Sequence, residues 1–276
     1  MLSITTDYMT GLGCPEPYLR RIAAHGFTHV HWCHQWNTDF LYAEPEIDAI
    51  EGWMRAYHLG LTDVHASDGQ EKNWLSPVEY ERLAGLELVM NRMHFARRLG
   101  SDVIIMHMPT APAEAVESES FWSRVRRTLD ALRPESQRYG VRIAIENGGP
   151  GHLNSIAPVF EMYPADYIGL CYDCGHGNLA EDGLDWLDKL GNRLLAMHLH
   201  DNDGLSDQHK LPFTGTVDWD RLTRLIAKST YQKWVSLELS AHNTGISDED
   251  HLLDLAYAAA VRLQAMVDFY RTGSPA

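Results

Sequence analysis

The feature that most constrains the fold is a regular alternation of short apolar runs with segments of helical spacing along the whole chain. The apolar runs are LSITT from Leu2, FTHVHWC from Phe27, LTDVHAS from Leu61, DVIIMHM from Asp102, VRIAIEN from Val141, IGLCYDCGH from Ile168, LLAMHLHD from Leu194 and WVSLELS from Trp234. Helix C-caps are expected at five glycines: Gly26, Gly60, Gly100, Gly140 and Gly191. Eight strand–helix units in series predict a parallel (β/α)₈ TIM barrel. An open doubly wound sheet is the alternative, but no G-x-G-x-x-G motif follows any of the runs.

Length and composition are consistent with one such barrel. A chain of 276 residues with 45% hydrophobic residues can bury a large core, and no segment reads as a linker. We therefore expect a single domain over residues 1–276. The four cysteines are too few and too scattered for a disulfide scaffold, and the C-x-x-C of Cys171 and Cys174 is interpreted as a pair of reduced thiols.

The charge balance excludes several kinds of partner. Lys and Arg number 23 against 38 Asp and Glu, giving a net charge of −15. Such a surface repels polyanions, so we expect neither a nucleic acid nor an anionic membrane as partner. The first residues lack a basic segment followed by an apolar one, and no apolar stretch approaches the roughly 20 residues that span a bilayer. A cytoplasmic protein is expected, and a homo-oligomer is left open.

Four of the runs end in acidic or imidazole side chains, which are Glu146, Asp173, His198 and Glu238. Because successive strand residues point to opposite faces, Glu146 shares a face with Ala144 and lies opposite the larger Ile143 and Ile145. Catalytic groups of TIM barrels lie at the carboxyl ends of the strands. Three carboxylates and an imidazole that converge there are costly unless a cation or protons neutralise them. A divalent metal site is the simplest expectation.

Further polar and aromatic residues fall at the same predicted rim. We predict that they bind substrate: His65, His107, His176, His200, Asp207, His209 and Trp36. A lone histidine at a strand end is usually structural, but clustering of this kind is typical of a metal or acid–base site. An aromatic ring such as Trp36 stacks well on the C–H face of a sugar, although it could instead pack a loop or a subunit interface.

These motifs resemble the xylose isomerase-like barrels, a group that includes sugar isomerases and epimerases, inosose dehydratases and apurinic-site endonucleases. The resemblance covers nearly the whole chain and rests on IAIEN, YDCGH, MHLHDNDG followed by DQH, and SLEL. It implies one divalent metal bound by Glu146, Asp173, His198 and Glu238. The H-x-x-D pattern favours His198, with Asp201, over His200 as the ligand. His176 matches a histidine that contacts a substrate oxygen in the epimerases.

The function expected from these residues is that of a metal-dependent sugar isomerase or epimerase acting on a keto sugar or keto-polyol. The metal would stabilise an enediolate, and Glu146 and Glu238 would remove and return the proton as the catalytic pair. Oxygen-rich ligation with one imidazole favours Mn²⁺, with Mg²⁺, Co²⁺ or Zn²⁺ as alternatives. A salt-bridge network is disfavoured, because Arg142 and Lys233 are the only cations near the four runs.

Two alternative functions stay open at this point. An inosose-type dehydratase, a lyase, would use the same proton abstraction on a cyclitol. A zinc phosphodiesterase of the apurinic endonuclease type is implied by His65, His107, Asp207 and His209, which match positions that hold additional zinc in those enzymes. The acidic or neutral rim loops disfavour it. Epimerases of free ketohexoses carry an arginine where this chain has Gly204, so the substrate, the reaction and the number of metals stay open.

Overall fold

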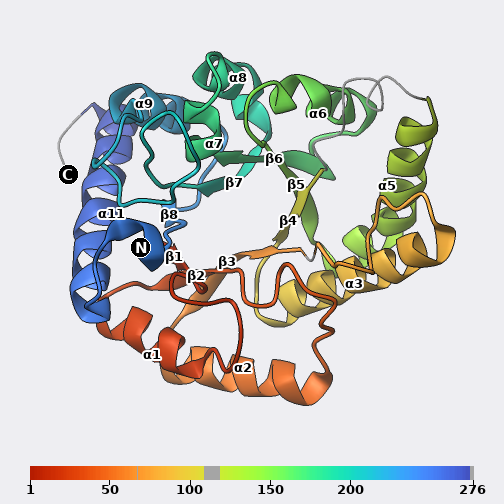
Figure 1. Ribbon diagram of the computed structural model, residues 1–276, viewed down its shortest axis with the longest axis horizontal. Helices are drawn as coiled ribbons and strands as arrows, with labels where there is room; N and C mark the ends of the chain where they lie inside the picture. Colours follow the sequence, from red (N-terminus) through yellow and green to blue (C-terminus); the bar gives the residue numbers. More distant parts are fainter. Residues whose placement is uncertain (67, 109–118, 274–276) are drawn as a thin grey trace.

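The computed structural model describes residues 1–66, 68–108 and 119–273. Its strands are β1 (Ser3–Thr5), β2 (His29–Trp32), β3 (Gly60–His65), β4 (Val103–His107), β5 (Arg142–Glu146), β6 (Ile168–Asp173), β7 (Leu194–His198) and β8 (Ser236–Leu237). All neighbouring strands pair in parallel in the order β7-β6-β5-β4-β3-β2-β1-β8. A parallel bridge between Leu199 and Leu237 joins the two ends. The predicted (β/α)₈ TIM barrel is thus confirmed, as Figure 1 shows.

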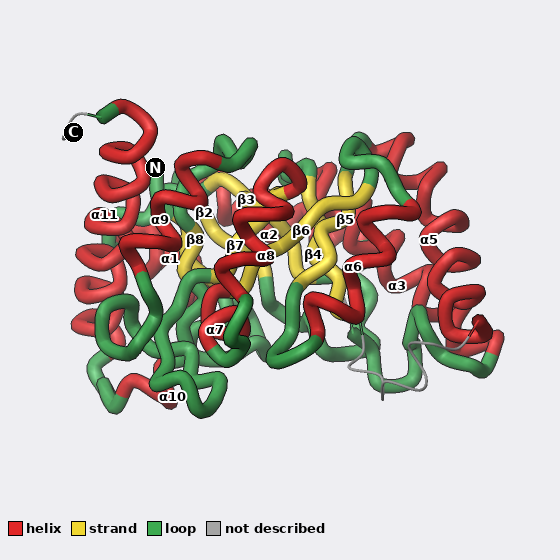
Figure 2. Tube along the Cα trace, turned by 90° about the horizontal axis from the view of Figure 1, so that it is seen from above, coloured by secondary structure: helices red, strands yellow, loops and turns green. Residues whose placement is uncertain are grey.

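Helices surround the strands as an outer ring (Figure 1). They are α1 (Glu16–Ala24), α2 (Glu44–Ala56), α3 (Glu79–Arg98), α5 (Glu119–Tyr139), α6 (His152–Met162), α7 (Cys174–Asn178), α8 (Gly183–Leu190), the 3₁₀ turn η1 (Gly191–Arg193), α9 (Trp219–Lys228), α10 (Ala241–Thr244) and α11 (Glu249–Thr272). Within the described ranges, none of these helices combines the length and apolarity needed to cross a membrane. Short α7 and α10 lie among the loops along the edge of the barrel where the strands end (Figure 2).

The structure departs from the sequence expectation at one of the five glycines. Gly26, Gly100 and Gly140 follow helices with positive φ, as expected for C-caps. Gly191 is the C-cap of α8, although its φ is −57°, whereas Gly60 opens β3 instead of ending a helix. The run from Ile168 ends as a strand at Asp173, the residue expected to close it.

That run changes to a helix because of one side chain. The carboxylate of Asp173 accepts a hydrogen bond from the backbone N–H of His176 at 2.7 Å and so caps α7. An aspartate in this position satisfies an N–H that has no partner inside the helix. The cap ends β6 at Asp173 and turns the chain across the barrel mouth.

The barrel interior follows the predicted alternation of side chains. Inward-facing residues form a small apolar layer of their own, made of Val103, Ile105, Ala144, Cys171, Leu195 and Ala196. Their outward-facing neighbours, such as Ile143 and Ile145, belong to the larger core between strands and helices. Each such buried aliphatic side chain contributes about 1.5–3 kcal/mol. The polar residues at the carboxyl ends of the strands lie next to this apolar layer.

Candidate metal centre and active site

The structure brings the four proposed metal ligands together at the carboxyl ends of β5 to β8. Glu146, Asp173 and His198 are the last residues of their strands, and Glu238 directly follows β8. Parallel pairing sets Asp173 beside His198. One ligand atom from each of the four lies within 4.8 Å of the others. This is the spacing that a single cation needs.

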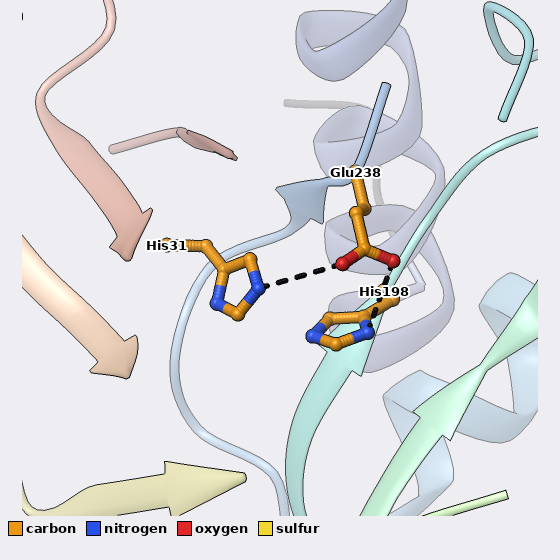
Figure 3. Close-up of side chains that lie close together, drawn as sticks. All are labelled: His31, His198 and Glu238. Atoms are coloured by element: carbon orange, nitrogen blue, oxygen red, sulfur yellow. Dashed lines mark ion pairs between the residues drawn. The ribbon is translucent and has the colours of Figure 1, made fainter. Parts of the chain in front are cut away.

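Nδ1 of His198 is the focus of this group. It lies 3.2 Å from Oε1 of Glu146, 3.1 Å from Oε2 of Glu238 and 3.9 Å from Oδ2 of Asp173. The His198 side chain is fully buried, yet neither ring nitrogen has a hydrogen-bond partner among the residues that the structure describes. A buried nitrogen without a partner, surrounded by three carboxylate oxygens, fits a divalent cation that accepts oxygen and imidazole ligands. Figure 3 shows Glu238 reaching His198.

Histidines, rather than Lys or Arg, supply the counter-charge for these acids. Among the described residues, every ion pair of Glu146, Asp173 and Glu238 involves a histidine. Arg142 and Lys233, the two cations that the sequence places near the strands, both bind Asp102, outside this group. The site therefore holds its carboxylates without a fixed positive charge.

The pKa values of the outer histidines reflect this arrangement. Burial lowers the pKa of His176, but Asp173, Asp207 and Glu146 outweigh burial and raise it to about 11. Burial likewise lowers the pKa of His209, and its contact with Asp207 helps to raise it to about 10. These imidazoles are protonated at neutral pH. They place donors, not acceptors, at the mouth of the site.

His65, His107 and Trp36 form one wall of the site. Nε2 of His107 lies 2.8 Å from Oε2 of Glu146, and Nε2 of His65 lies 3.6 Å from the same oxygen. The indole ring of Trp36 packs against both imidazoles, with ring centroids 4.4 Å and 5.4 Å away. Burial lowers the pKa of His65, which therefore stays neutral. His107 is 31% exposed and faces the mouth.

His176, His200, Asp207 and His209 form the opposite wall. Asp207 lies 3.3 Å from Nε2 of His176 and 2.9 Å from Nε2 of His209. Nε2 of His200 is 3.1 Å from both carboxylate oxygens of Asp173, and its ring stacks on His209 at 4.0 Å. All seven residues expected to contact substrate thus surround the four proposed ligands, although His65 and His200 are too buried to form the open mouth.

Asp201 has a different place from the one that the H-x-x-D pattern suggests. Its carboxylate accepts hydrogen bonds from the backbone N–H groups of Asn202, Thr214 and Val217 and from the indole N–H of Trp219. It therefore anchors the loop after β7, which carries Asp207 and His209, and stands outside the group of ligands.

Sequence reasoning missed His31, Cys33 and Asp63 beside the site. His31 and Asp63 are both fully buried and contact each other through Nδ1 and Oδ1. The alternation in FTHVHWC would have placed His31 and Cys33 on one face, which was a usable signal. The same alternation places Asp63 on the face of His65, two residues later, whereas its pairing with His31 depends on an irregularity in strand register.

Comparison with known proteins supports the fold and the family. A family model described as "Xylose isomerase-like TIM barrel" matches residues 19–261. The uncharacterized protein y4fM of Sinorhizobium fredii is 32% identical over 268 residues, which are 88% of this chain and 86% of that protein. Fructoselysine 3-epimerase of Escherichia coli O157:H7 is 23% identical over 201 residues, covering 70% and 73% of the two chains.

Solved structures agree on the architecture. A crystal structure of D-psicose 3-epimerase in the presence of D-fructose superposes with a TM-score of 0.77 at 16% identity, and the match covers 96% of this chain and 99% of that one. At this identity the likeness concerns the fold alone. With the family model spanning most of the sequence, this chain belongs to the xylose isomerase-like TIM barrel family.

Proposed function

We propose that the protein is a metal-dependent epimerase or isomerase of a keto sugar or keto-polyol. The observation that carries the proposal is the arrangement of Glu146 and Glu238 around one nitrogen of His198, at 3.2 Å and 3.1 Å. Two carboxylates from separate strands thereby reach one reaction centre from two directions. The similarity to fructoselysine 3-epimerase supports chemistry on a sugar.

The proposed ligands Glu146, Asp173, His198 and Glu238 would hold one divalent ion, with Mn²⁺ as the first candidate and Mg²⁺, Co²⁺ or Zn²⁺ as alternatives. When bound, such an ion supplies Lewis-acid stabilisation of negative charge on adjacent substrate oxygens. The donor set fits it, because within the described residues Nδ1 of His198 makes no hydrogen bond and faces carboxylate oxygens instead.

Side chains of the protein would transfer the proton and bind the substrate. Glu238, which is 12% exposed, is the better placed base for a carbon-bound proton, and Glu146, at 3% exposure, is the carboxylate on the other side. Protonated His176, 20% exposed, donates to a substrate oxygen at the mouth. Trp36 covers the imidazoles of His65 and His107 and offers a flat face to the C–H groups of a sugar.

The decisive experiment follows hydrogen exchange in D₂O. The protein is incubated with a panel of ketoses and inososes, and solvent deuterium is expected at the carbon next to the carbonyl. Glu146→Gln and Glu238→Gln should each abolish the exchange, whereas Glu87→Gln, an exposed glutamate on α3, should not. Conversion without any deuterium in product or recovered substrate would favour a hydride shift. An unsaturated product would assign a dehydratase instead.

A second candidate function has one specific observation in its favour. His65, His107 and Glu146 also lie within metal-ligand spacing of one another, and Asp207 joins His176 to His209. Together with the four proposed ligands these residues could hold several zinc ions for phosphodiester hydrolysis. The net charge of −15 opposes DNA binding. Cleavage of a duplex with an abasic site, in the presence of zinc, would place this function first.

A further inference from the structure

Beneath the proposed metal centre lies a fully buried pair of polar residues, His31 on β2 and Asp63 on β3. Both side chains have 0% exposure, and Nδ1 of His31 contacts Oδ1 of Asp63. The second oxygen of Asp63 is buried and has no hydrogen-bond partner within the described part of the chain. Interior layers of such barrels are normally filled by branched aliphatic residues, as they are here beside β4 and β5. A buried ionisable pair often adds little to the free energy of unfolding, so stability alone does not explain why this pair is present.

A local irregularity of the sheet creates the pair. Val30 pairs with Leu61, but the next residue, His31, pairs with Asp63, so that Thr62 is the extra residue of a bulge. Without the bulge, His31 would pair with Thr62 instead of Asp63. The carbonyl of Thr62 accepts hydrogen bonds from Nζ of Lys233 at 2.8 Å and from Oγ of Ser101 at 3.1 Å. Bulges of this kind often re-aim a side chain next to an active site.

The pair points at one oxygen of Glu238. Nε2 of His31 lies 2.8 Å from Sγ of Cys33 and 3.6 Å from Oε1 of Glu238, while Oε2 of the same carboxylate faces His198 (Figure 3). The thiol of Cys33 donates to Oε1 across 3.8 Å. The imidazole of His31 also lies against that of His198, with ring centroids 4.4 Å apart. Oε1 of Glu238 thus contacts His31 and Cys33, while Oε2 contacts His198.

We infer that the buried Asp63–His31 pair is a positioning device that fixes the Glu238 carboxylate, leaving Oε2 for the metal. The inference rests on the proposed function, because it takes Glu238 as a metal ligand. Asp63 fixes the ring orientation of His31. His31 then holds Oε1 through its own contact at 3.6 Å and through the Cys33 thiol, which lies 2.8 Å from its Nε2. Carboxylate ligands held by such outer partners typically lose about 10–100-fold in metal affinity when the partner is removed.

The first test compares two substitutions of one residue. The amide nitrogen of glutamine reaches the position of Nε2, whereas that of asparagine stops near Nδ1. We expect His31→Asn to weaken Mn²⁺ or Zn²⁺ binding, measured by competition with a chelator, by about 10–100-fold. His31→Gln should keep most of the affinity. His29→Gln, on the same strand but at its opposite end, is the matched control and should bind as the wild type does.

The second test separates positioning from a structural role. The double variant His31→Leu/Asp63→Val replaces a buried ion pair by apolar residues, a change that is often neutral or stabilising. We expect its thermal midpoint without metal to equal or exceed that of the wild type, while its metal affinity falls by about 10–100-fold. Wild-type affinity in the folded double variant, or in His31→Asn, would overturn the positioning role alone. A wild-type protein that binds no ion would overturn both the metal centre and this inference.

Discussion

Nε2 of His107 lies 2.8 Å from Oε2 of Glu146. The other oxygen of that carboxylate faces Nδ1 of His198 at 3.2 Å. Glu146 is therefore divided between an imidazole at the mouth of the barrel and the proposed metal centre. Two arrangements are compatible with these contacts. In a site with one ion, His107 holds Glu146 and contacts substrate; in a site with several ions, Glu146 bridges two of them.

Replacing His107 by alanine tests that distinction. We expect one ion per chain in both wild type and His107→Ala, because His107 is not among the proposed ligands. The KM for a keto substrate should rise about tenfold or more, since a hydrogen bond involving a charged group is lost. Elemental analysis gives the stoichiometry, and deuterium exchange gives the KM. More than one zinc in the wild type, with one fewer in the variant, would contradict the single-ion site.

Asp173→Asn should remove the metal without removing α7. Asparagine caps helices as well as aspartate does, so the turn at His176 should persist while the ionic ligand is lost. We expect a metal content near zero, against wild-type content in Glu87→Gln. A chelator should lower the unfolding free energy of the wild type by about 2.7 kcal/mol if metal was present at about 100 times its Kd. In a denaturant titration, the same chelator should not change the unfolding free energy of Asp173→Asn. If the chelator lowered the unfolding free energy equally in both proteins, Asp173 would not be a ligand.

Gly175 is required by a close approach to His200. A Cβ at this position would meet Cε1 of His200 at 1.9 Å, and His200 is fully buried against Asp173. We expect Gly175→Ala to lower the unfolding free energy by about 1–3 kcal/mol through overpacking and to weaken metal binding. The control is Gly149→Ala, where a Cβ would meet nothing within 4 Å. Urea unfolding measures the stability and chelator competition measures the metal affinity. Equal stability and equal affinity in Gly175→Ala and Gly149→Ala would show that His200 does not require a glycine at position 175.

His29, at the start of β2, predicts a pH dependence of stability. Burial, with help from the N-terminus and Lys233, lowers its pKa to about 4. Since the folded pKa lies below the unfolded value, the unfolded chain binds the proton first, and stability falls as the pH drops from about 6.5 toward 4. Because His29 is only half buried, we expect a contribution of about 1 kcal/mol between pH 7 and pH 5.

The corresponding variant is His29→Gln. Its loss of unfolding free energy between pH 7 and pH 5 should be about 1 kcal/mol smaller than that of the wild type. The exposed His251→Gln on α11 should lose as much as the wild type does. If all three proteins lost the same unfolding free energy between pH 7 and pH 5, the pKa of His29 would be the same in the folded and unfolded chains.

The sequence by itself determined the barrel and the four residues at its carboxyl rim. Apolar residues recur with a period of two in strands and of about 3.6 in helices. The local pattern of apolar residues therefore predicts the order of the strands and helices. The same alternation placed Glu146 and Ala144 on the inner face, as the interior cluster confirms. Parallel pairing then forces neighbouring strand ends to one edge.

Tertiary structure alone decided which polar groups touch. Asp63 pairs with His31 only because a bulge at Thr62 shifts the register of β2 against β3. Asp201 matches a motif around the ligands, yet its carboxylate is taken up by four loop donors. Gly60 carries the residue type of a cap but lies at the start of a strand. Contacts of this kind join residues far apart in the chain, and their free energy depends on register and packing that only the closed barrel fixes.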